Sequence, residues 1–363
     1  MKRTVNRNQR NVVNPRRGFS FVEMIVTLAI LALLFSLLSP AVTRSRQSAR
    51  QLECMTRLRN VDMAMLNVLD TTGRFPASGN FTDTGAFQTL HNWVLDVLPW
   101  LDQSATYNAW KLGAPIQDPV NFPLTKLFFP ILVCPADISV EQSDDATTYG
   151  NLSFVVNGGA GYTTYYQGVH DCPVDLLAQK LDLNGDGVTC PSSGDGAAGD
   201  KSIFLMMGLF FNETWTEGVS RRHHTAATVT DGMSNTVVLS ENVRTGYNPG
   251  TSDPSESSWA SPHSVLTSFY IGDPCLLGGC TPGNVNYQRA NSEEGAINSG
   301  LGLPEGKSPI PNSFHIGGVN MAFGDGRVQF ISQRIDGNVY AAIVSPQGAG
   351  LSGLLHQTLD GAP

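Results

Sequence analysis

The feature that most constrains this chain is an uninterrupted apolar run close to its N-terminus. From Phe19 to Val42 the only charged residue is Glu23, and the 19 residues from Met24 to Val42 carry no charge. As an α-helix, such a segment would be roughly 28 Å long, close to the roughly 30 Å hydrocarbon core of a bilayer. The sequence therefore predicts a membrane-spanning helix over residues 19–42.

The residues before this run predict its orientation. Six basic residues and no acidic residue lie between Met1 and Gly18. A basic flank stays in the cytoplasm, so everything after Val42 is expected outside it. An ordinary secretory signal would end its apolar part with a small-residue cleavage site, and no A-x-A-like site follows here. Instead, Gly18 stands between the basic leader and the apolar run.

This order of parts resembles a type IV prepilin signal. In that family a prepilin peptidase cuts after the glycine and methylates the new first residue, and the apolar helix stays in the mature protein. The resemblance implies cleavage after Gly18 and methylation of Phe19. Glu23 is the fifth residue counted from Phe19, and Pro40 is the twenty-second, where pilin helices often carry a kinking proline.

Glu23 is expected to have an assembly partner. A lone carboxylate inside an apolar run costs several kcal/mol to bury without one. In pilin-like filaments that partner is the amino terminus of a neighbouring subunit. The alternative is an uncleaved signal anchor with Glu23 near the lipid head groups, which explains neither Gly18 nor Pro40.

The helical pattern continues beyond the membrane run. Apolar residues recur at helical spacing as far as Leu69, and Thr71-Thr72-Gly73 ends the pattern. We expect one helix over 19–70, with its second half packed on a sheet. The predicted fold class is α+β and pilin-like: residues 1–18 form the leader, and residues 71–363 form a globular domain with a mostly antiparallel sheet and long loops.

Within the globular domain, apolar spacing and turn residues predict the further elements. Two short helices are expected around 87–100 and 102–110, and long loops at 171–200, 244–262 and 273–312. The expected strands are 127–133, 152–156, 203–211, 236–240, 265–271, 318–323 and 327–332.

Charge narrows the class of partners. Without the leader, the chain has 17 basic and 31 acidic residues. A net charge of this sign repels nucleic acid and anionic lipid, which argues against a DNA-uptake pilin. The expected partners are the prepilin peptidase, like or related pilin-like subunits and the inner membrane, with no nucleic acid.

The six cysteines all follow the membrane run, and in an exported protein an even number favours disulfides. Spacing makes two local pairs plausible, and a third pair would tie the long helix to the globular domain. Free buried thiols are the alternative. The pairs are Cys172 with Cys190, Cys275 with Cys280, and Cys54 with Cys134.

Several short motifs resemble a second family, a large bacterial group of pilin-like exported proteins whose globular domain has no assigned function. Its signature is a histidine, nine residues, then Asp-Gly, matched here by His315, Asp325 and Gly326. This resemblance implies a location and an architecture but no activity. Further matching pieces are Cys54, Gly73–Pro76, Cys134-Pro135, Asn157–Gly159 and Thr230–Asn242.

The residues around the His-x9-Asp-Gly signature indicate a structural role. Alternating residues on both sides of Asp325-Gly326 predict a hairpin in which Asp325 bonds within the turn and Gly326 adopts positive φ. His315 could also hydrogen-bond a buried carboxylate such as Asp325 and clamp that hairpin.

A calcium site is predicted in the loop that begins at Asp182, and an Asn-Gly- and Asp-Gly-rich turn that binds nothing is the alternative. Asp182, Asn184 and Asp186 offer oxygens at positions 1, 3 and 5 of an EF-hand-like loop, and Val188 offers its carbonyl at position 7. Ser193 stands where a bidentate Glu belongs. The acidic residues available to substitute for that Glu are Asp175, Asp195 and Asp200.

These observations predict a pseudopilin-like structural subunit of a type II secretion or type IV pilus-like filament. It would be a single-pass inner-membrane protein with a periplasmic or extracellular domain. The alternative is a binding module that uses the helix only as an anchor, which the large domain favours. No G-x-S-x-G or H-E-x-x-H motif is present, so no enzymatic activity is expected.

Overall fold

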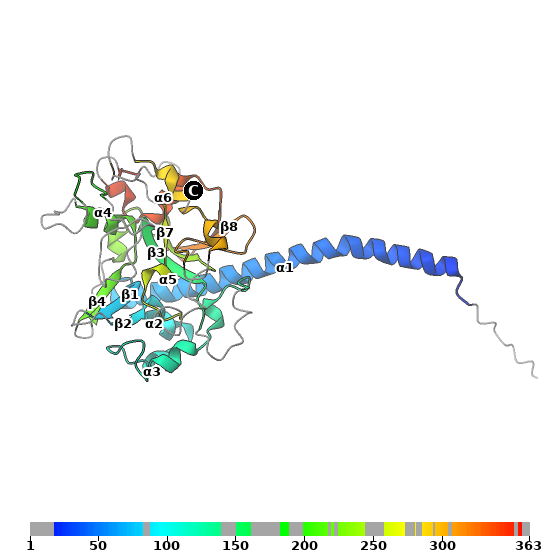
Figure 1. Cartoon of the computed structure of the whole chain (residues 1–363), viewed down its shortest axis with the longest axis horizontal. Helices are drawn as coiled ribbons and strands as arrows, with labels where there is room; N and C mark the ends of the chain where they lie inside the picture. Colours follow the sequence, from blue (N-terminus) through cyan, green and yellow to red (C-terminus); the bar gives the residue numbers. More distant parts are fainter. Residues whose placement is uncertain are drawn as a thin grey trace, which may run out of the picture. The chain divides into compact units, whose positions relative to one another are not determined.

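The computed structural model divides between Ala49 and Arg50 into two compact units. One element, helix α1 (Phe21–Thr72), contributes residues to both (Figure 1). The described residues are 18–82, 88–138, 150–160, 182–188, 199–216, 219–220, 224–243, 258–272, 280, 285–292, 295–303, 307–351 and 355–357.

Helix α1 ends where the sequence predicts. Its last residue is Thr72, and Gly73 follows with φ +74°, a conformation that glycine adopts without steric cost. In the part from Arg50 onward, one face of the helix is buried, at Cys54, Leu58, Val61, Met65 and Leu69. This i, i+4, i+7 spacing is the amphipathic pattern expected of a helix packed on a sheet.

The second unit contains two sheets. The smaller has the order β2-β1-β4-β5 and the larger β7-β3-β6-β8-β9. Most strand pairs are antiparallel, and the parallel ones are β1 with β4 and β3 with β7. The strands are β1 Gly79–Thr82, β2 Thr89–Asn92, β3 Phe154–Ala160, β4 Asn212–Thr216, β5 Val219–Ser220, β6 Val237–Glu241, β7 Ser268–Ile271, β8 Gly318–Phe323 and β9 Val328–Ser332.

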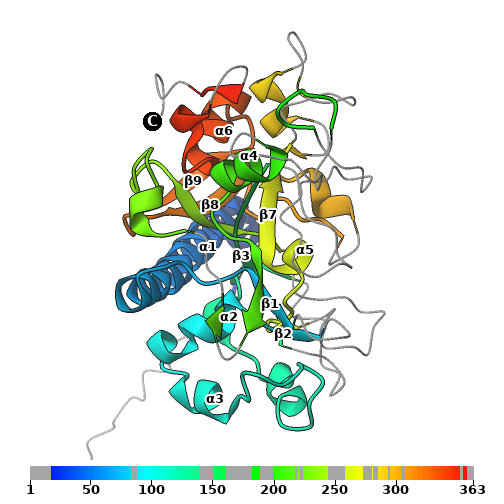
Figure 2. The same ribbon diagram turned by 90° about the vertical axis from the view of Figure 1, so that its left-hand side faces the viewer.

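Five further α-helices lie within the described residues of this unit (Figure 2). Two of them, α4 and α6, lie near one another beside the larger sheet, whereas α2 and α3 lie near the smaller one. Their bounds are α2 Trp93–Val97, α3 Ser104–Ala109, α4 Asp200–Met207, α5 Ser264–Thr267 and α6 Gly337–Val344.

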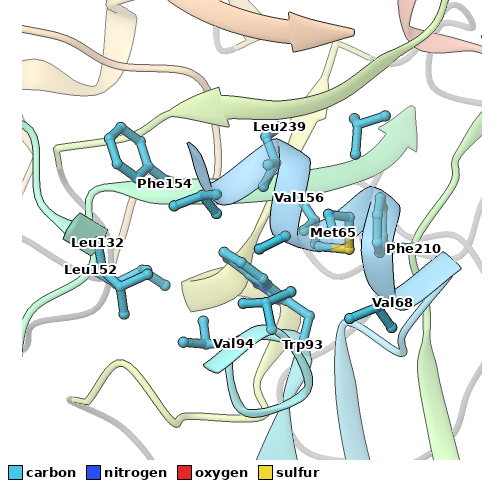
Figure 3. Close-up of a cluster of buried hydrophobic side chains, with 14 of the residues drawn as sticks. Met65, Val68, Trp93, Val94, Leu132, Leu152, Phe154, Val156, Phe210 and Leu239 are labelled. Carbon is cyan, nitrogen blue, oxygen red and sulfur yellow. The ribbon is translucent and has the colours of Figure 1, made fainter. Parts of the chain in front are cut away.

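The larger sheet separates two hydrophobic cores. Alternation along β3 sends Phe154 and Val156 into the core on the α1 side, together with Met65, Trp93 and other residues (Figure 3). The intervening Val155 belongs to the core that α4 and α6 cover. The fold is thus α+β as predicted, with α1 packed on one face of a mixed, mostly antiparallel sheet.

The segment Asn157-Gly158-Gly159 marks a close approach of two backbones. Gly159 has φ +90°, and a Cβ on it would lie 2.7 Å from the Cα of Gly208, at the end of α4. The pairing of β3 with β7 shifts register at this point. Glycine is required on both segments because no side chain fits between them.

Two predicted strands are wrong. Residues 203–211 were expected as a strand, but Asp200–Met207 is helix α4, which buries Phe204 and Met207 against the sheet. The expected strand 127–133 is replaced by the 3-10 turn Pro130–Leu132. Pro130 lies in the middle of that run, where it would remove a ladder hydrogen bond.

The remaining predicted elements are closer to the structure. The expected helix over 87–100 is shorter, because residues 89–92 form β2 before α2 begins. The expected strand 265–271 begins as the turn of α5 and becomes β7 at Ser268. The hairpin of β8 and β9 and the helix α3 are confirmed.

Candidate functional sites: the N-terminal helix and a buried Cys-Cys-Glu-His cluster

The predicted processing site lies at the start of the described chain. No atom lies within 4 Å of the position that a Cβ on Gly18 would take, and the Phe19 side chain is 87% exposed. Ser20 precedes the first helical residue, and its N–H donates to Glu23 Oε2 at 2.8 Å. Glu23 therefore caps its own helix in the unprocessed chain, a local role that the sequence analysis did not consider.

The apolar part of α1 has the chemistry of a membrane span. It is the only described helix that is long and apolar enough to cross a membrane. None of its most apolar stretch is buried within the chain. Pro40 lies inside this helix and the helix continues past it.

A second candidate site is a buried cluster of four side chains, from here on the Cys-Cys-Glu-His cluster. Cys54 comes from α1, Cys134 follows the turn Pro130–Leu132, Glu241 ends β6, and His315 precedes β8. All four residues are buried, and one ligand atom from each lies within 4.8 Å of the other three. Four segments far apart in the sequence thus converge on one point.

The contacts within the cluster centre on one carboxylate oxygen, Glu241 Oε1. It lies 3.1 Å from His315 Nε2, 3.3 Å from Cys134 Sγ and 2.5 Å from Cys54 Sγ. Cys134 Sγ also lies 3.4 Å from His315 Nε2. Three polar neighbours thus compete for a single oxygen, which offers about two lone-pair sites.

Neighbouring backbone groups orient these side chains. The N–H of Asn320 in β8 donates to the other Glu241 oxygen, Oε2, at 2.6 Å. The N–H of Ala136 donates to Cys134 Sγ. The Asn320 bond occupies Oε2, so Glu241 Oε1 is the oxygen that meets the other three members of the cluster.

Arg57, one turn after Cys54 on α1, fixes the segment that carries Cys134. Its guanidinium donates to the carbonyl oxygens of Pro130 and Val133 at 2.6 and 2.8 Å. The segment around Cys134 has little regular structure of its own, so this clamp sets its distance from the helix. Arg57 is a positioning residue that the sequence analysis missed, since only its basic charge is visible in sequence.

Burial and proximity shift the protonation equilibria of the cluster in opposite directions. Burial alone would raise the pKa of Glu241 and lower that of His315, but their mutual contact reverses both shifts. The pKa of His315 rises to about 10 because Cys134 and Glu241 both stabilise the imidazolium. Burial raises the pKa of Cys54, whereas the hydrogen bond from Cys54 lowers the pKa of Cys134.

Two known protein families match this chain, and together they cover most of it. Residues 13–39 match the prokaryotic N-terminal methylation motif, and residues 43–338 match the family described as protein of unknown function (DUF1559). The chain belongs to the DUF1559 family. No curated protein and no solved structure matches it.

All four residues of the cluster lie within the part of this DUF1559 chain that matches the family, residues 43–338. In the sequence, each appears in a separate short motif, and nothing in their spacing joins them. Glu241 in particular is visible only as part of the piece that ends at Asn242, so its role as the centre of the cluster was missed.

The predicted disulfide between Cys54 and Cys134 needs correction. Both are free thiols in the structure, side by side with Glu241 and His315. Cys280 is disulfide-bonded, in agreement with the expectation that it pairs, but its predicted partner Cys275 lies outside the described residues. Cys172 and Cys190 lie outside them as well.

The predicted contact between His315 and Asp325 is also wrong. Asp325 is exposed and accepts a hydrogen bond from the Arg327 N–H at 3.0 Å, while Gly326 has φ +84°. The Asp-Gly pair thus makes the turn between β8 and β9, as expected. The buried carboxylate that His315 contacts is Glu241 instead.

The loop 182–188 is held by hydrogen bonds from backbone N–H groups to acidic side chains. Both carboxylate oxygens of Asp182 accept backbone N–H bonds, from Gly185 at 2.7 Å and from Gly187 at 2.9 Å. Asp186 and Asn184 are exposed and hydrogen-bonded to each other. Asp200, one of the three proposed substitutes for the last ligand, accepts from the Leu183 and Asn184 N–H groups.

Nothing in this loop tests calcium binding. The hydrogen bonds within it are also those of a Gly- and Asp-rich turn that binds no ion. Ser193, Asp175 and Asp195 lie outside the described residues. Calcium binding by Asp182, Asn184, Asp186 and the Val188 carbonyl stays a prediction.

Proposed function

We propose that this protein is a pseudopilin-like structural subunit of a type II secretion or type IV pilus-like filament. Prepilin peptidase would cleave after Gly18, and the apolar part of α1 would hold the subunit in the inner membrane before assembly. The domain formed by the second unit would lie on the periplasmic or extracellular side. Its chemistry is assembly rather than catalysis.

The observation that carries the proposal is the methylation motif over residues 13–39, which spans Gly18, Phe19 and Glu23. Two further features support it. The apolar side chains that follow Phe19 are not buried within the chain, so lipid or neighbouring subunits must cover them. Glu23 is the only charge among these side chains.

Processing is tested by mass spectrometry of the membrane-extracted protein. We expect an N-terminus at methylated Phe19 and, for Gly18→Ala, an intact leader, because a side chain at this position obstructs the peptidase. An intact leader on the unmutated protein, in cells with active prepilin peptidase, would refute the proposal.

Assembly is tested by cross-linking Glu23→Gln with wild-type subunits in the membrane. The variant keeps the shape and removes the charge, so insertion should be unchanged. Incorporation should be lost, because a buried charge left without its partner costs about 3–5 kcal/mol. Asp70→Asn, an exposed acidic position on the same helix, is the control that should assemble normally.

The second candidate is a surface or periplasmic binding module that uses α1 only as an anchor. The size of the globular unit, which extends from Arg50 to Pro363, favours it over a repeating filament subunit. This candidate predicts normal processing of Gly18 but full tolerance of Glu23→Gln. The cross-linking experiment therefore separates the two.

A further inference from the structure

We propose that Cys54, Cys134, Glu241 and His315 bind a structural zinc ion. The proposal does not depend on filament assembly, because it concerns only the unit from Arg50 onward.

The donor set is one that zinc prefers. Zinc is bound by cysteine thiolates, histidine nitrogen and carboxylate oxygen, usually with four ligands in a tetrahedron. Two thiolates also disfavour magnesium and calcium, which prefer oxygen ligands. Among the described residues, this is the only group of at least three His, Cys, Asp or Glu side chains close enough to share an ion.

Three of the distances between ligand atoms lie close to the edges of a zinc tetrahedron. Bonds of about 2.0–2.3 Å to zinc place neighbouring ligand atoms about 3.3–3.8 Å apart. The contacts of Cys134 Sγ with Glu241 Oε1 and His315 Nε2 are 3.3 and 3.4 Å, and the contact of His315 with Glu241 is 3.1 Å. The contact of Cys54 Sγ with Glu241 Oε1, at 2.5 Å, is clearly shorter than such an edge, and all four ligand atoms lie within 4.8 Å of one another.

Hydrogen bonding alone accounts less well for this arrangement. Without an ion, Glu241 Oε1 is the shared acceptor for the Sγ atoms of Cys54 and Cys134 and for the His315 ring. A cation between the four atoms replaces these competing contacts with one bond from each ligand. The N–H groups of Asn320 and Ala136 then act as outer-shell donors, which orient a carboxylate and a thiolate toward the metal.

Because the cluster is buried, the ion would have a structural role. Catalytic zinc keeps one position open to water or substrate, whereas structural sites have four protein ligands. Here all four ligands are protein side chains and all four residues are buried. The ion would join α1 to β6, to the segment before β8 and to the segment of Cys134.

The experiment uses the full chain, purified in detergent without chelators. Total metal analysis should find about one zinc per chain, and zinc X-ray absorption should show a shell of two sulfur and two nitrogen or oxygen atoms. Cys54→Ser and His315→Gln should each reduce the zinc content to near zero. His356→Gln, an exposed histidine, and Glu53→Gln, an exposed acid beside Cys54, should leave it unchanged.

Each other outcome overturns the proposal. Absence of zinc from the unmutated protein, an absorption shell without sulfur, or a Cys54–Cys134 disulfide in mass spectrometry would do so. If the variants fail to fold, the absorption spectrum of the unmutated protein still decides. Processing at Gly18 is measured on the same preparation, so failure of the zinc site is distinguishable from failure of the proposed function.

Discussion

The two faces of the larger sheet bury similar apolar side chains but treat polar groups differently. On the α1 face, Glu241 and His315 lie with two cysteines inside the hydrophobic core. On the α4 and α6 face, the polar cluster is formed by the buried Asp182 and Asp200, beside Leu183 of the core. The carboxylate of the first cluster meets the side chains of three other residues, whereas the two carboxylates of the second accept hydrogen bonds from nearby backbone N–H groups.

The largest effect is expected at the centre of the buried cluster. Glu241→Ala leaves His315 without its carboxylate and Asn320 N–H without its acceptor. The free energy of unfolding should fall by about 3–5 kcal/mol, measured by urea denaturation of the full chain in detergent. Glu53→Ala breaks an exposed ion pair with Arg57 and should cost only about 0.3–0.5 kcal/mol. Equal losses of stability in the two variants would contradict the expectation that the buried cluster contributes more than the exposed ion pair.

The next effect concerns the loop on the opposite face. If the loop 182–188 binds calcium, binding should stabilise the protein by about 2.7 kcal/mol at a hundredfold excess over Kd, with Kd about 10⁻⁴–10⁻³ M. The protein is dialysed against calcium-free buffer and melted with and without added calcium. Chelators are avoided because they would also remove metal from the buried cluster.

Magnesium and a double variant are the controls for the loop. Magnesium should raise the melting temperature much less, since it loses its water reluctantly. Asp182→Asn with Asp186→Asn should erase the calcium effect. An unchanged melting temperature for the unmutated protein would reduce the loop to a turn.

A smaller effect on stability is expected at Asp62, on the α1 face. It is buried on α1 and, among the described residues, neither carboxylate oxygen has a hydrogen-bond partner. Burial raises its pKa well above the usual value, nearby Asp325 adds to this, and Arg59 opposes it. An acid whose pKa rises on folding binds its proton more tightly when folded, so stability falls as pH rises from the unfolded pKa of about 4.

Asp62→Asn should therefore stabilise the protein at pH 7, by about 1–2 kcal/mol, and should flatten stability between pH 4 and the folded pKa. Thermal melts across this range measure both. Asp70→Asn, exposed on the same helix, should change neither. A loss of stability in Asp62→Asn would show that the charge has a favourable partner.

The smallest effect lies on the α4 and α6 face. The hydroxyl of Tyr340 is buried in α6 without a hydrogen-bond partner among the described residues. Tyr340→Phe should raise the free energy of unfolding by about 1 kcal/mol or leave it unchanged. Tyr287→Phe is the matched control, because its hydroxyl donates to the Leu355 carbonyl at 2.6 Å, and it should cost about 1 kcal/mol. If both variants lose stability, Tyr340 is hydrogen-bonded after all.

Sequence predicted well those elements whose signals are local. The end of α1 was found because Gly73 stops a regular apolar repeat, and the β8–β9 hairpin because alternation surrounds Asp325-Gly326. The strand predicted over residues 203–211 was wrong for the opposite reason, because its signal is not decided locally. A short apolar run fits a strand or a buried helix equally well, and only the packing of α4 against the sheet decides.

The Cys-Cys-Glu-His cluster could not be predicted as a unit. Cys54 and Glu241 are 187 residues apart, and Cys134 and His315 are 181 apart. The sequence favours a disulfide between Cys54 and Cys134 because cysteine number and spacing suggest pairs of cysteines and no other partner. The carboxylate that joins them carries no such signal, since its position depends on the register of β6 against β8.

The wide separation of the four cluster residues has a consequence during synthesis of the chain. Cys54 emerges on the first helix, and at about 5–20 residues per second Glu241 follows it about 10–40 s later. During that interval Cys54 is a thiol without its final neighbours, in a chain whose other cysteines are still being added. Correct maturation therefore requires that Cys54 stay reduced until β6 and then His315 are in place.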